Sequence, residues 1–242
     1  MQLDKLVFKP AGDAAVVLQW CLPVTPELNR HITACKDRLE QCSIVGIEDI
    51  VPAYSTLLIY YNPVLTEYNR LVEEIKSLFL RESEKTGVNE GKTVVIPVFY
   101  GGRYGPDLES LAETKGLAVS EVVKRHCQAV YQVYMIGFLP GFPYLGFVDE
   151  SISMGRRKEP RELVSAGSVG IAGRQTGIYS LNSPGGWQII GRTPIRLFHA
   201  EKGRFLLRAG DTVIFKAVDE GIGFSDINPD AWGDLYGNDE GH

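Results

Sequence analysis

Residues 134–146 read YMIGFLPGFPYLG, residues 165–179 read SAGSVGIAGRQTGIY, and residues 182–194 read NSPGGWQIIGRTP. Glycine at this density permits tight turns and close approach of the backbone to other backbone or to a ligand. Large aromatic side chains stand between the glycines and can line a pocket. The three clusters therefore predict a ligand-binding groove. Its expected lining consists of Phe138, Phe142, Tyr144, Tyr179, Ser183, Gly185, Gly186 and Trp187.

Short apolar runs separated by glycine and proline continue on both sides of these clusters. They predict strands at residues 93–99, 131–136, 168–172, 187–190, 195–198, 205–207 and 212–215. Two helices are expected earlier, one beginning near Pro106 and Asp107 and ending at Gly116, the other capped by Ser120. Many short strands with glycine and proline turns are typical of a β-barrel, which we expect over residues 89–218.

The first 88 residues have a different texture, in which strands alternate with amphipathic helices. Strands are expected at residues 14–20, 44–51 and 56–61, with helices capped by Thr25 and Thr66. The order β-α-β-β-α predicts a small two-layer domain with its helices on one sheet face. The whole chain is therefore expected to be an α+β protein: a two-layer α/β N-terminal domain followed by the barrel.

Two polar segments flank the barrel. Residues 81–92 (RESEKTGVNEGK) have the composition of a linker. Residues 219–242 hold seven acidic residues and no lysine or arginine. This acidic tail is expected either to be disordered or to dock through Phe224, Trp232 and Tyr236.

Composition narrows the classes of partner and compartment. The chain has 25 basic and 30 acidic residues, a net charge of −5, which disfavours nucleic-acid and anionic-membrane surfaces. Its four cysteines lack CxxC spacing and its four histidines are scattered, so neither a metal site nor a disulfide framework is expected. No signal peptide and no apolar run of about 18 residues is evident, so we expect a cytoplasmic protein.

Common catalytic motifs are absent from the sequence: there is no GxxxxGK[ST], GxGxxG, GxSxG or HExxH. Candidate catalytic residues are therefore chosen by their position relative to the glycine clusters. His126, near a helix end before the first glycine cluster, is either an acid, base or donor in the groove or a packed helix-end histidine. Arg161 is either a carboxylate clamp or a surface ion-pair residue. Gln175 and Thr176 lie between glycines and are placed to present fixed donors, whereas Asp211 is expected to shape a turn.

A set of short motifs in fixed order extends along most of the chain. They are residues 96–102 (IPVFYGG), 105–108 (GPDL), His126 with Tyr131, 137–146 (GFLPGFPYLG), 166–173 (AGSVGIAG), 175–177 (QTG), 183–187 (SPGGW) and 207–211 (LRAGD). This series resembles the B subunit of prokaryotic ATP-dependent 5-oxoprolinase. That family includes proteins labelled allophanate hydrolase subunit 1 and the Kip-type inhibitors of sporulation histidine kinases. The chain departs from the family at Gly155-Arg156 and Val164-Ser165, where prolines are usual, which is expected to loosen the loop carrying Arg161.

The resemblance implies a cyclophilin-like barrel and a complex with two further proteins, a homologous C subunit and an A subunit. Such a complex opens 5-oxo-L-proline to L-glutamate at the expense of ATP, whose site is on this chain or on a partner. Because the sequence has no nucleotide-phosphate motif and no nucleophile beside a base, we expect the isolated chain to be inactive. Arg161, Gln175 and Thr176 are the candidates for recognising the carboxylate and lactam of such a substrate. Two alternatives stay open: a Kip-type inhibitor of a histidine kinase, and a carboxyltransferase-type subunit of urea or allophanate metabolism.

Overall fold

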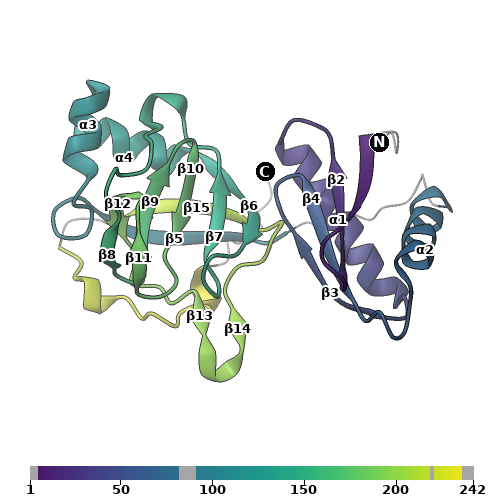
Figure 1. Cartoon of the computed structure of the whole chain (residues 1–242). Coiled ribbons are helices and arrows are strands. Elements are labelled where there is room, and N and C mark those ends of the chain that lie inside the picture. Colours follow the sequence, from purple (N-terminus) through teal and green to yellow (C-terminus); the bar gives the residue numbers. More distant parts are fainter. Residues whose placement is uncertain (1–4, 82–90, 219–220, 236–242) are drawn as a thin grey trace, which may run out of the picture. The chain divides into compact units, whose positions relative to one another are not determined.

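The computed structural model of the chain describes residues 5–81, 91–218 and 221–235. The chain divides into two compact units, residues 1–90 and 91–242 (Figure 1). Each unit has its own apolar core, so each is described by itself. The polar stretch at residues 82–90, expected to be a linker, lies outside the described residues.

The N-terminal unit is an antiparallel sheet in the order β1-β2-β4-β3 packed against two helices. Its elements are β1 (Leu6–Pro10), β2 (Ala15–Trp20), α1 (Pro26–Cys42), β3 (Ile47–Pro52), β4 (Thr56–Tyr61) and α2 (Tyr68–Arg81). Alternate residues of β2 and β4, such as Leu18 and Ile59, share one core with Ile32 of α1 and Ile75 of α2. Because strand side chains alternate between faces, both helices cover the same side of the sheet. The two-layer prediction is confirmed.

Local chemistry explains where α1 begins. The Thr25 hydroxyl accepts a hydrogen bond from Leu28 N at 3.2 Å, and Pro26 occupies the first turn, as the sequence predicts. Strand β1 was not expected. The expected cap of α2 is wrong: that helix begins at Tyr68, and the buried hydroxyl of Thr66 has no hydrogen-bond partner within the described residues.

The second unit contains a closed barrel with the strand order β10-β7-β6-β15-β5-β12-β9. Its strands are β5 (Thr93–Tyr100), β6 (Val130–Ile136), β7 (Pro143–Gly146), β9 (Ser168–Ala172), β10 (Gln175–Ile178), β12 (Gln188–Arg192) and β15 (Thr212–Ala217). Only the β15–β5 pair is parallel among the barrel pairings of the described residues. The barrel prediction, and with it the α+β class, is confirmed.

Helices and two small two-stranded sheets surround the barrel. They are α3 (Leu108–Lys115), α4 (Val119–Gln128), the pair β8 (Arg161–Val164) and β11 (Ser183–Gly185), and the pair β13 (Phe198–His199) and β14 (Arg204–Phe205). Gly116 ends α3 as expected, but α4 begins at Val119 after an N-cap residue, Ala118, that makes no side-chain cap bond. Ser120 therefore lies inside the first turn of α4 and does not cap it.

The sequence misplaced two kinds of strand. Strands β7 and β10 lie within the glycine clusters and were not expected, whereas the runs at 195–198 and 205–207 contribute only the short hairpin β13–β14.

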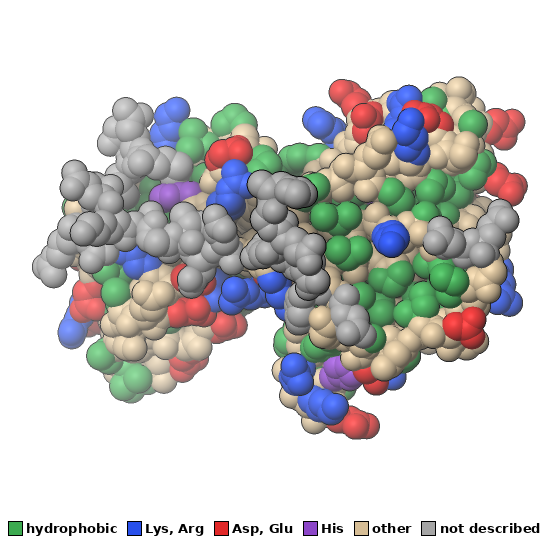
Figure 2. Space-filling model, turned by 180° about the vertical axis from the view of Figure 1, so that it is seen from behind, with side chains coloured by type: hydrophobic (Ala, Val, Ile, Leu, Met, Phe, Trp, Pro, Cys, Tyr) green, Lys and Arg blue, Asp and Glu red, His purple; other side chains and the backbone are tan. Residues whose placement is uncertain are grey.

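On β5 and β15, buried residues alternate with half-buried ones such as Val95, Pro97 and Ile214 beside exposed Lys216. Figure 2 shows apolar side chains gathered around a basic group on the back of this unit.

Part of the acidic C-terminal segment packs onto the barrel unit. Phe224 stacks on Tyr104 with ring centroids 5.0 Å apart, and Trp232 donates from Nε1 to the Arg196 carbonyl at 2.8 Å. Trp232 and Leu235 belong to the barrel core, whereas Tyr236 lies outside the described residues. Over the ranges that are described, none of the helices has the length and apolarity required to cross a bilayer.

Candidate functional site

Aromatic side chains gather in a cluster that is separate from the barrel core. Phe142 is at its centre, with ring centroids 4.9 Å from Tyr144, 5.3 Å from Tyr179, 5.4 Å from Trp187 and 5.5 Å from Phe138. All four pairs meet edge to face, the arrangement that the quadrupoles of aromatic rings favour. Phe138 is 60% exposed, whereas Phe142, Tyr179 and Trp187 are buried. These five rings, called the aromatic wall below, are packed closely against one another, and Phe138 is the exposed ring at their edge.

Glycines make room for these rings. A Cβ atom on Gly177 would lie 3.0 Å from the Trp187 ring and 3.1 Å from Phe142, and one on Gly185 would lie only 2.3 Å from the Tyr179 hydroxyl. Any side chain at either position would force an aromatic residue to move. The glycine clusters therefore exist in part because the aromatic wall lies directly against the backbone.

Strand alternation separates two residues that the sequence placed in one site. In β10, Gly177 pairs with Gly170, whose Cβ position faces Trp187 at 3.1 Å, and Gln175 pairs with Ala172 of the aromatic cluster. Paired residues share a face, so Gln175 lies on the side of the aromatic cluster. Thr176, between them, points to the opposite face and is fully buried in the barrel interior.

His126 is also inside the barrel and does not face the groove. Its Nε2 lies 2.9 Å from the Thr176 hydroxyl, which donates its own proton to the Gly170 carbonyl at 3.0 Å. His126 Nε2 must therefore carry a proton, which leaves Nδ1 to accept from the Tyr100 hydroxyl at 2.7 Å. The ring stacks on Phe215 and is completely shielded from solvent. Burial lowers the pKa of His126 to about 3, so the ring is neutral.

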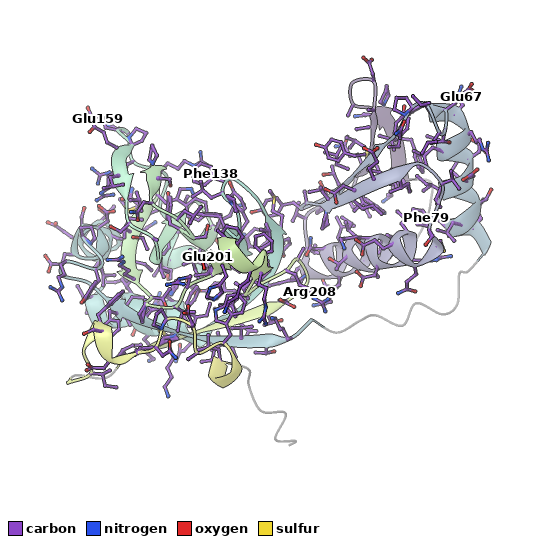
Figure 3. The ribbon with its side chains drawn as sticks, turned by 90° about the horizontal axis from the view of Figure 1, so that it is seen from below. Glu67, Phe79, Phe138, Glu159, Glu201 and Arg208 are labelled. Carbon is purple, nitrogen blue, oxygen red and sulfur yellow. The ribbon has the colours of Figure 1, made fainter. Side chains whose placement is uncertain are left out.

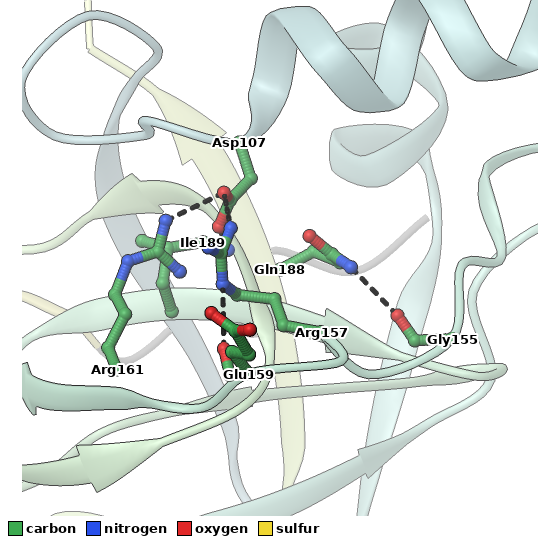
Figure 4. Close-up of polar contacts among 7 residues, drawn as sticks. All are labelled: Asp107, Gly155, Arg157, Glu159, Arg161, Gln188 and Ile189. Carbon is green, nitrogen blue, oxygen red and sulfur yellow. Dashed lines mark hydrogen bonds and ion pairs between the residues drawn. The ribbon is translucent and has the colours of Figure 1, made fainter.

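A charged cluster links Asp107, the N-cap residue of α3, to Arg161 at the start of β8 and to Arg157 in the preceding loop. Buried Asp107 accepts from Arg161 Nη2 at 2.7 Å and from Arg157 Nη1 at 2.9 Å, both at Oδ1, while its Oδ2 accepts from Ile189 N at 2.6 Å (Figure 4). Arg161 Nη1 is buried and has no hydrogen-bond partner within the described residues. Arg161 thus forms an ion pair, but with a buried acid of this chain rather than at the surface. One of its donors stays unpaired within the described residues, so the sequence alternative of a carboxylate clamp stays a prediction.

The loop that carries the arginines is tied to the neighbouring strands. Arg157 N donates to the Gly186 carbonyl at 2.7 Å, and Gln188 Nε2 donates to the Gly155 carbonyl at 2.9 Å (Figure 4). Arg161 itself pairs with Gly185 across β8 and β11. These bonds hold the loop despite the prolines that it lacks relative to the family pattern.

The arginines and the aromatic wall adjoin. Ile189, which donates to Asp107, belongs to the same apolar cluster as Trp187 and Tyr179. Burial raises the pKa of Tyr179, and the positive charges of Arg156 and Arg161 are close enough to counter part of that rise. Figure 3 shows Phe138 and Glu159, from the arginine loop, on the same side of the barrel unit.

The remaining candidates have structural surroundings. Ser183 is buried and its hydroxyl donates to the Pro184 carbonyl at 3.1 Å, while a Cβ on Gly186 would make ordinary contact with Pro160 at 3.7 Å. The sequence analysis missed Asp107 and Arg157 as site residues. Asp107 reads as a helix-start acid, and only the run of basic residues at 156–158 signals a charged loop.

Most of the chain matches known proteins. Residues 6–207 match the family described as carboxyltransferase domain, subdomain C and D. The B subunit of 5-oxoprolinase from Bacillus subtilis is 39% identical over 222 residues, which cover 86% of this chain and 91% of that protein. The B subunit of the same enzyme from Escherichia coli O157:H7 is 40% identical over 87% of this chain and 95% of that protein.

Solved structures show the same fold. The protein TTHA0988 superposes with a TM-score of 0.74 at 36% identity, covering 85% of this chain and 40% of the other. This chain therefore spans about two fifths of the length of that protein. Urea carboxylase from Kluyveromyces lactis has a TM-score of 0.70 at 18% identity, over 89% of this chain and 22% of the enzyme. At that identity the likeness concerns the fold alone.

Proposed function

The chain belongs to the family of 5-oxoprolinase B subunits, as its motifs predicted, and we propose on that basis that it is one component of a complex that hydrolyses 5-oxo-L-proline to L-glutamate. The observation that carries the proposal is identity of 38–40% to three proteins of that name, each over more than four fifths of the chain. Hydrolysis adds one water across the ring C–N bond, so the lactam carbonyl becomes a carboxylate and the nitrogen becomes an amine.

The surface beside the aromatic cluster has the chemistry that such a substrate needs. 5-Oxoproline is a small ring with one apolar edge, one lactam and one carboxylate. Phe138, which is exposed, and Tyr144, which is half-buried, are the rings that present apolar surface, while Phe142, Tyr179 and Trp187 support them from below. Gln175 lies on the same side of the sheet as this wall and supplies an amide that can pair with a lactam.

We further propose that the chain works only in assembly with the A and C subunits and that ATP drives the reaction. The sequence lacks the phosphate-binding GxxxxGK[ST] motif. Its one candidate histidine base near the groove, His126, is sealed inside the barrel. Both facts support a division of labour in which the partner proteins supply ATP binding and the groups that activate water.

The test is reconstitution. This chain, co-expressed with candidate A and C subunits, should release glutamate from 5-oxo-L-proline only when ATP is present, with formation of ADP and phosphate. The chain purified alone should release none. Glutamate release by the isolated chain would refute the division of labour. An assembled complex that forms no glutamate would refute the proposed reaction, and inhibition of histidine-kinase autophosphorylation by the chain would then support the Kip-type alternative.

A further inference from the structure

Two arginines beside the aromatic wall share a single buried carboxylate. Arg157 and Arg161 both donate to Oδ1 of Asp107, and the other oxygen of Asp107 is engaged by Ile189 N. One negative charge therefore faces two guanidinium charges, and Asp107 has no oxygen left over. Among these three side chains, the positive charges exceed the negative charge by one.

Arg161 also has an unused donor. Its Nη1 is buried without a hydrogen-bond partner in the described parts of the chain, whereas Nη2 donates to Asp107. Leaving a buried charged donor unpaired costs roughly 1–3 kcal/mol or more. The Arg161 side chain is 24% exposed and the Arg157 side chain is 36% exposed, so an anion can approach both guanidinium groups from solvent. A bound anion would add an acceptor to a cluster in which two guanidinium groups share one carboxylate.

The surrounding loop adds to the positive potential. Residues 156–161 hold four basic side chains, Arg156, Arg157, Lys158 and Arg161, and one acid, whereas the whole chain has a net charge of −5. Concentrated positive charge on an otherwise acidic protein attracts small anions to this place. Planar guanidinium groups favour planar, two-oxygen acceptors, so a carboxylate fits them well.

We propose that Arg157 and Arg161 form a carboxylate subsite beside the aromatic wall, with Asp107 as the positioning residue that fixes both guanidinium groups. This inference rests on the proposed function for the identity of the ligand, the carboxylate of 5-oxo-L-proline. Ile189 joins the arginine cluster to the buried aromatic rings, so the ring of the substrate would lie toward Phe138, the exposed ring of that cluster.

The experiment compares two ligands of the same size and shape: 5-oxo-L-proline, which has a carboxylate, and its neutral primary amide, 5-oxo-L-prolinamide. Binding of each to the assembled complex is measured by calorimetry, and KM and kcat are measured where turnover occurs. The variants are Arg161→Gln, Arg157→Gln and Asp107→Asn, with Arg161→Lys as the conservative change. Arg208→Gln is the matched control, because Arg208 also lies beside an aspartate, Asp211, at 3.5 Å but far from Phe138 and Glu159 (Figure 3).

Arg161→Gln should weaken binding of the acid by roughly 10- to 150-fold, the range for a lost hydrogen bond to a charged group, and binding of the amide by less than about threefold. Arg157→Gln should act in the same direction, and Asp107→Asn should raise KM for the acid more than it lowers kcat. Arg161→Lys should recover only part of the loss, since a single ammonium does not reproduce the planar fork. Arg208→Gln should leave the affinity for both ligands unchanged.

If Arg161→Gln weakens binding of the acid and the amide equally, or if Arg208→Gln weakens binding of the acid as much as Arg161→Gln does, the proposed subsite is wrong. Neither result would bear on the proposed reaction. Wild-type complex that binds the acid in preference to the amide but releases no glutamate would overturn the proposed reaction and leave the subsite standing. Failure of the wild-type complex to bind the acid at all would overturn both. The acid-to-amide ratio within one variant does not depend on how much of that protein is folded.

Discussion

The hydroxyl of Thr176 fixes the tautomer of the His126 ring inside the barrel. Nε2 of His126 donates to the Thr176 hydroxyl at 2.9 Å, and that hydroxyl is committed as a donor to the Gly170 carbonyl. The ring has no contact with water and its second nitrogen accepts from Tyr100. A proton added to His126 would therefore place a buried charge opposite the Tyr100 hydroxyl with no counter-charge beside it.

This arrangement predicts a pH dependence of stability. Burial lowers the folded-state pKa of His126 to about 3, below its usual value of 6.5. Between these values the unfolded chain binds a proton that the folded chain rejects, so the free energy of unfolding falls as pH falls below about 6.5, by about 1.4 kcal/mol per pH unit from this residue. Urea denaturation at pH 7.5 and pH 5.0 should show a loss of roughly 2 kcal/mol from His126.

The variant His126→Gln isolates this contribution. Glutamine can donate to Thr176 and accept from Tyr100 but does not titrate, so its own loss between the two pH values should be smaller than that of wild type by about 2 kcal/mol. Carboxylates that titrate in the same range contribute equally to both proteins and cancel. If wild type and His126→Gln lose the same free energy, the histidine is not the buried neutral group described above.

A second prediction concerns the backbone beneath Tyr179. Gly185→Ala would put a methyl group 2.3 Å from the Tyr179 hydroxyl, whereas Gly186→Ala next to it meets nothing closer than 3.7 Å. Gly185→Ala should therefore lower the free energy of unfolding by roughly 1–3 kcal/mol, as overpacking does, and Gly186→Ala should change it by less than about 0.5 kcal/mol. Denaturation followed by circular dichroism measures both, and similar values for the two would contradict the close packing of Tyr179 on β11.

The sequence predicted the architecture better than the site, and the reason is physical. Periodic apolar residues and caps such as Thr25 act locally, so the two-layer unit and most barrel strands follow from short-range patterns. Strand β10, read as QTGI, has no such pattern because its glycine serves the packing of Trp187, which no local rule reveals.

Site residues depend on contacts between distant segments. Asp107 meets Arg157 and Arg161 across 50 and 54 residues of sequence, so its role as their anchor is invisible in the GPDL motif. His126 and Thr176 are also 50 residues apart, and the sequence placed both in the groove because each stands near a glycine cluster. The aromatic residues that the sequence placed in the groove do lie together, because all of them stand among those glycines, and their role as a ligand-binding lining stays a prediction.

A third prediction separates a structural acid from the groove. Both carboxylate oxygens of buried Asp211 accept backbone N–H groups, Oδ2 from Arg208 at 2.9 Å and Oδ1 from Lys92 at 3.2 Å. Asp211→Asn keeps one acceptor and turns an amide toward the other donor, which should cost roughly 1–3 kcal/mol of stability. Because Asp211 shapes the turn before β15 and is not placed in the groove, kcat and KM of the folded complex should stay within about twofold of wild type. Loss of turnover in a folded Asp211→Asn complex would show that the site is at the wrong end of the barrel.

The last prediction tests Gln175 as a groove residue. Gln175 shares the face of Ala172 and the aromatic wall, so its amide is placed to pair with the lactam, whereas its neighbour Thr176 is turned away into the barrel. In the assembled complex, Gln175→Ala should lower kcat/KM for 5-oxo-L-proline by roughly 10- to 1000-fold, the range for loss of one well-placed polar contact. The variant chain should still fold and assemble with the partner proteins. Gln19→Ala, the same substitution on β2 of the N-terminal unit, where the side chain accepts from Lys9 Nζ at 2.8 Å, is the control and should keep full turnover. Turnover in Gln175→Ala equal to that of Gln19→Ala would remove Gln175 from the site and leave recognition of the lactam to a partner protein.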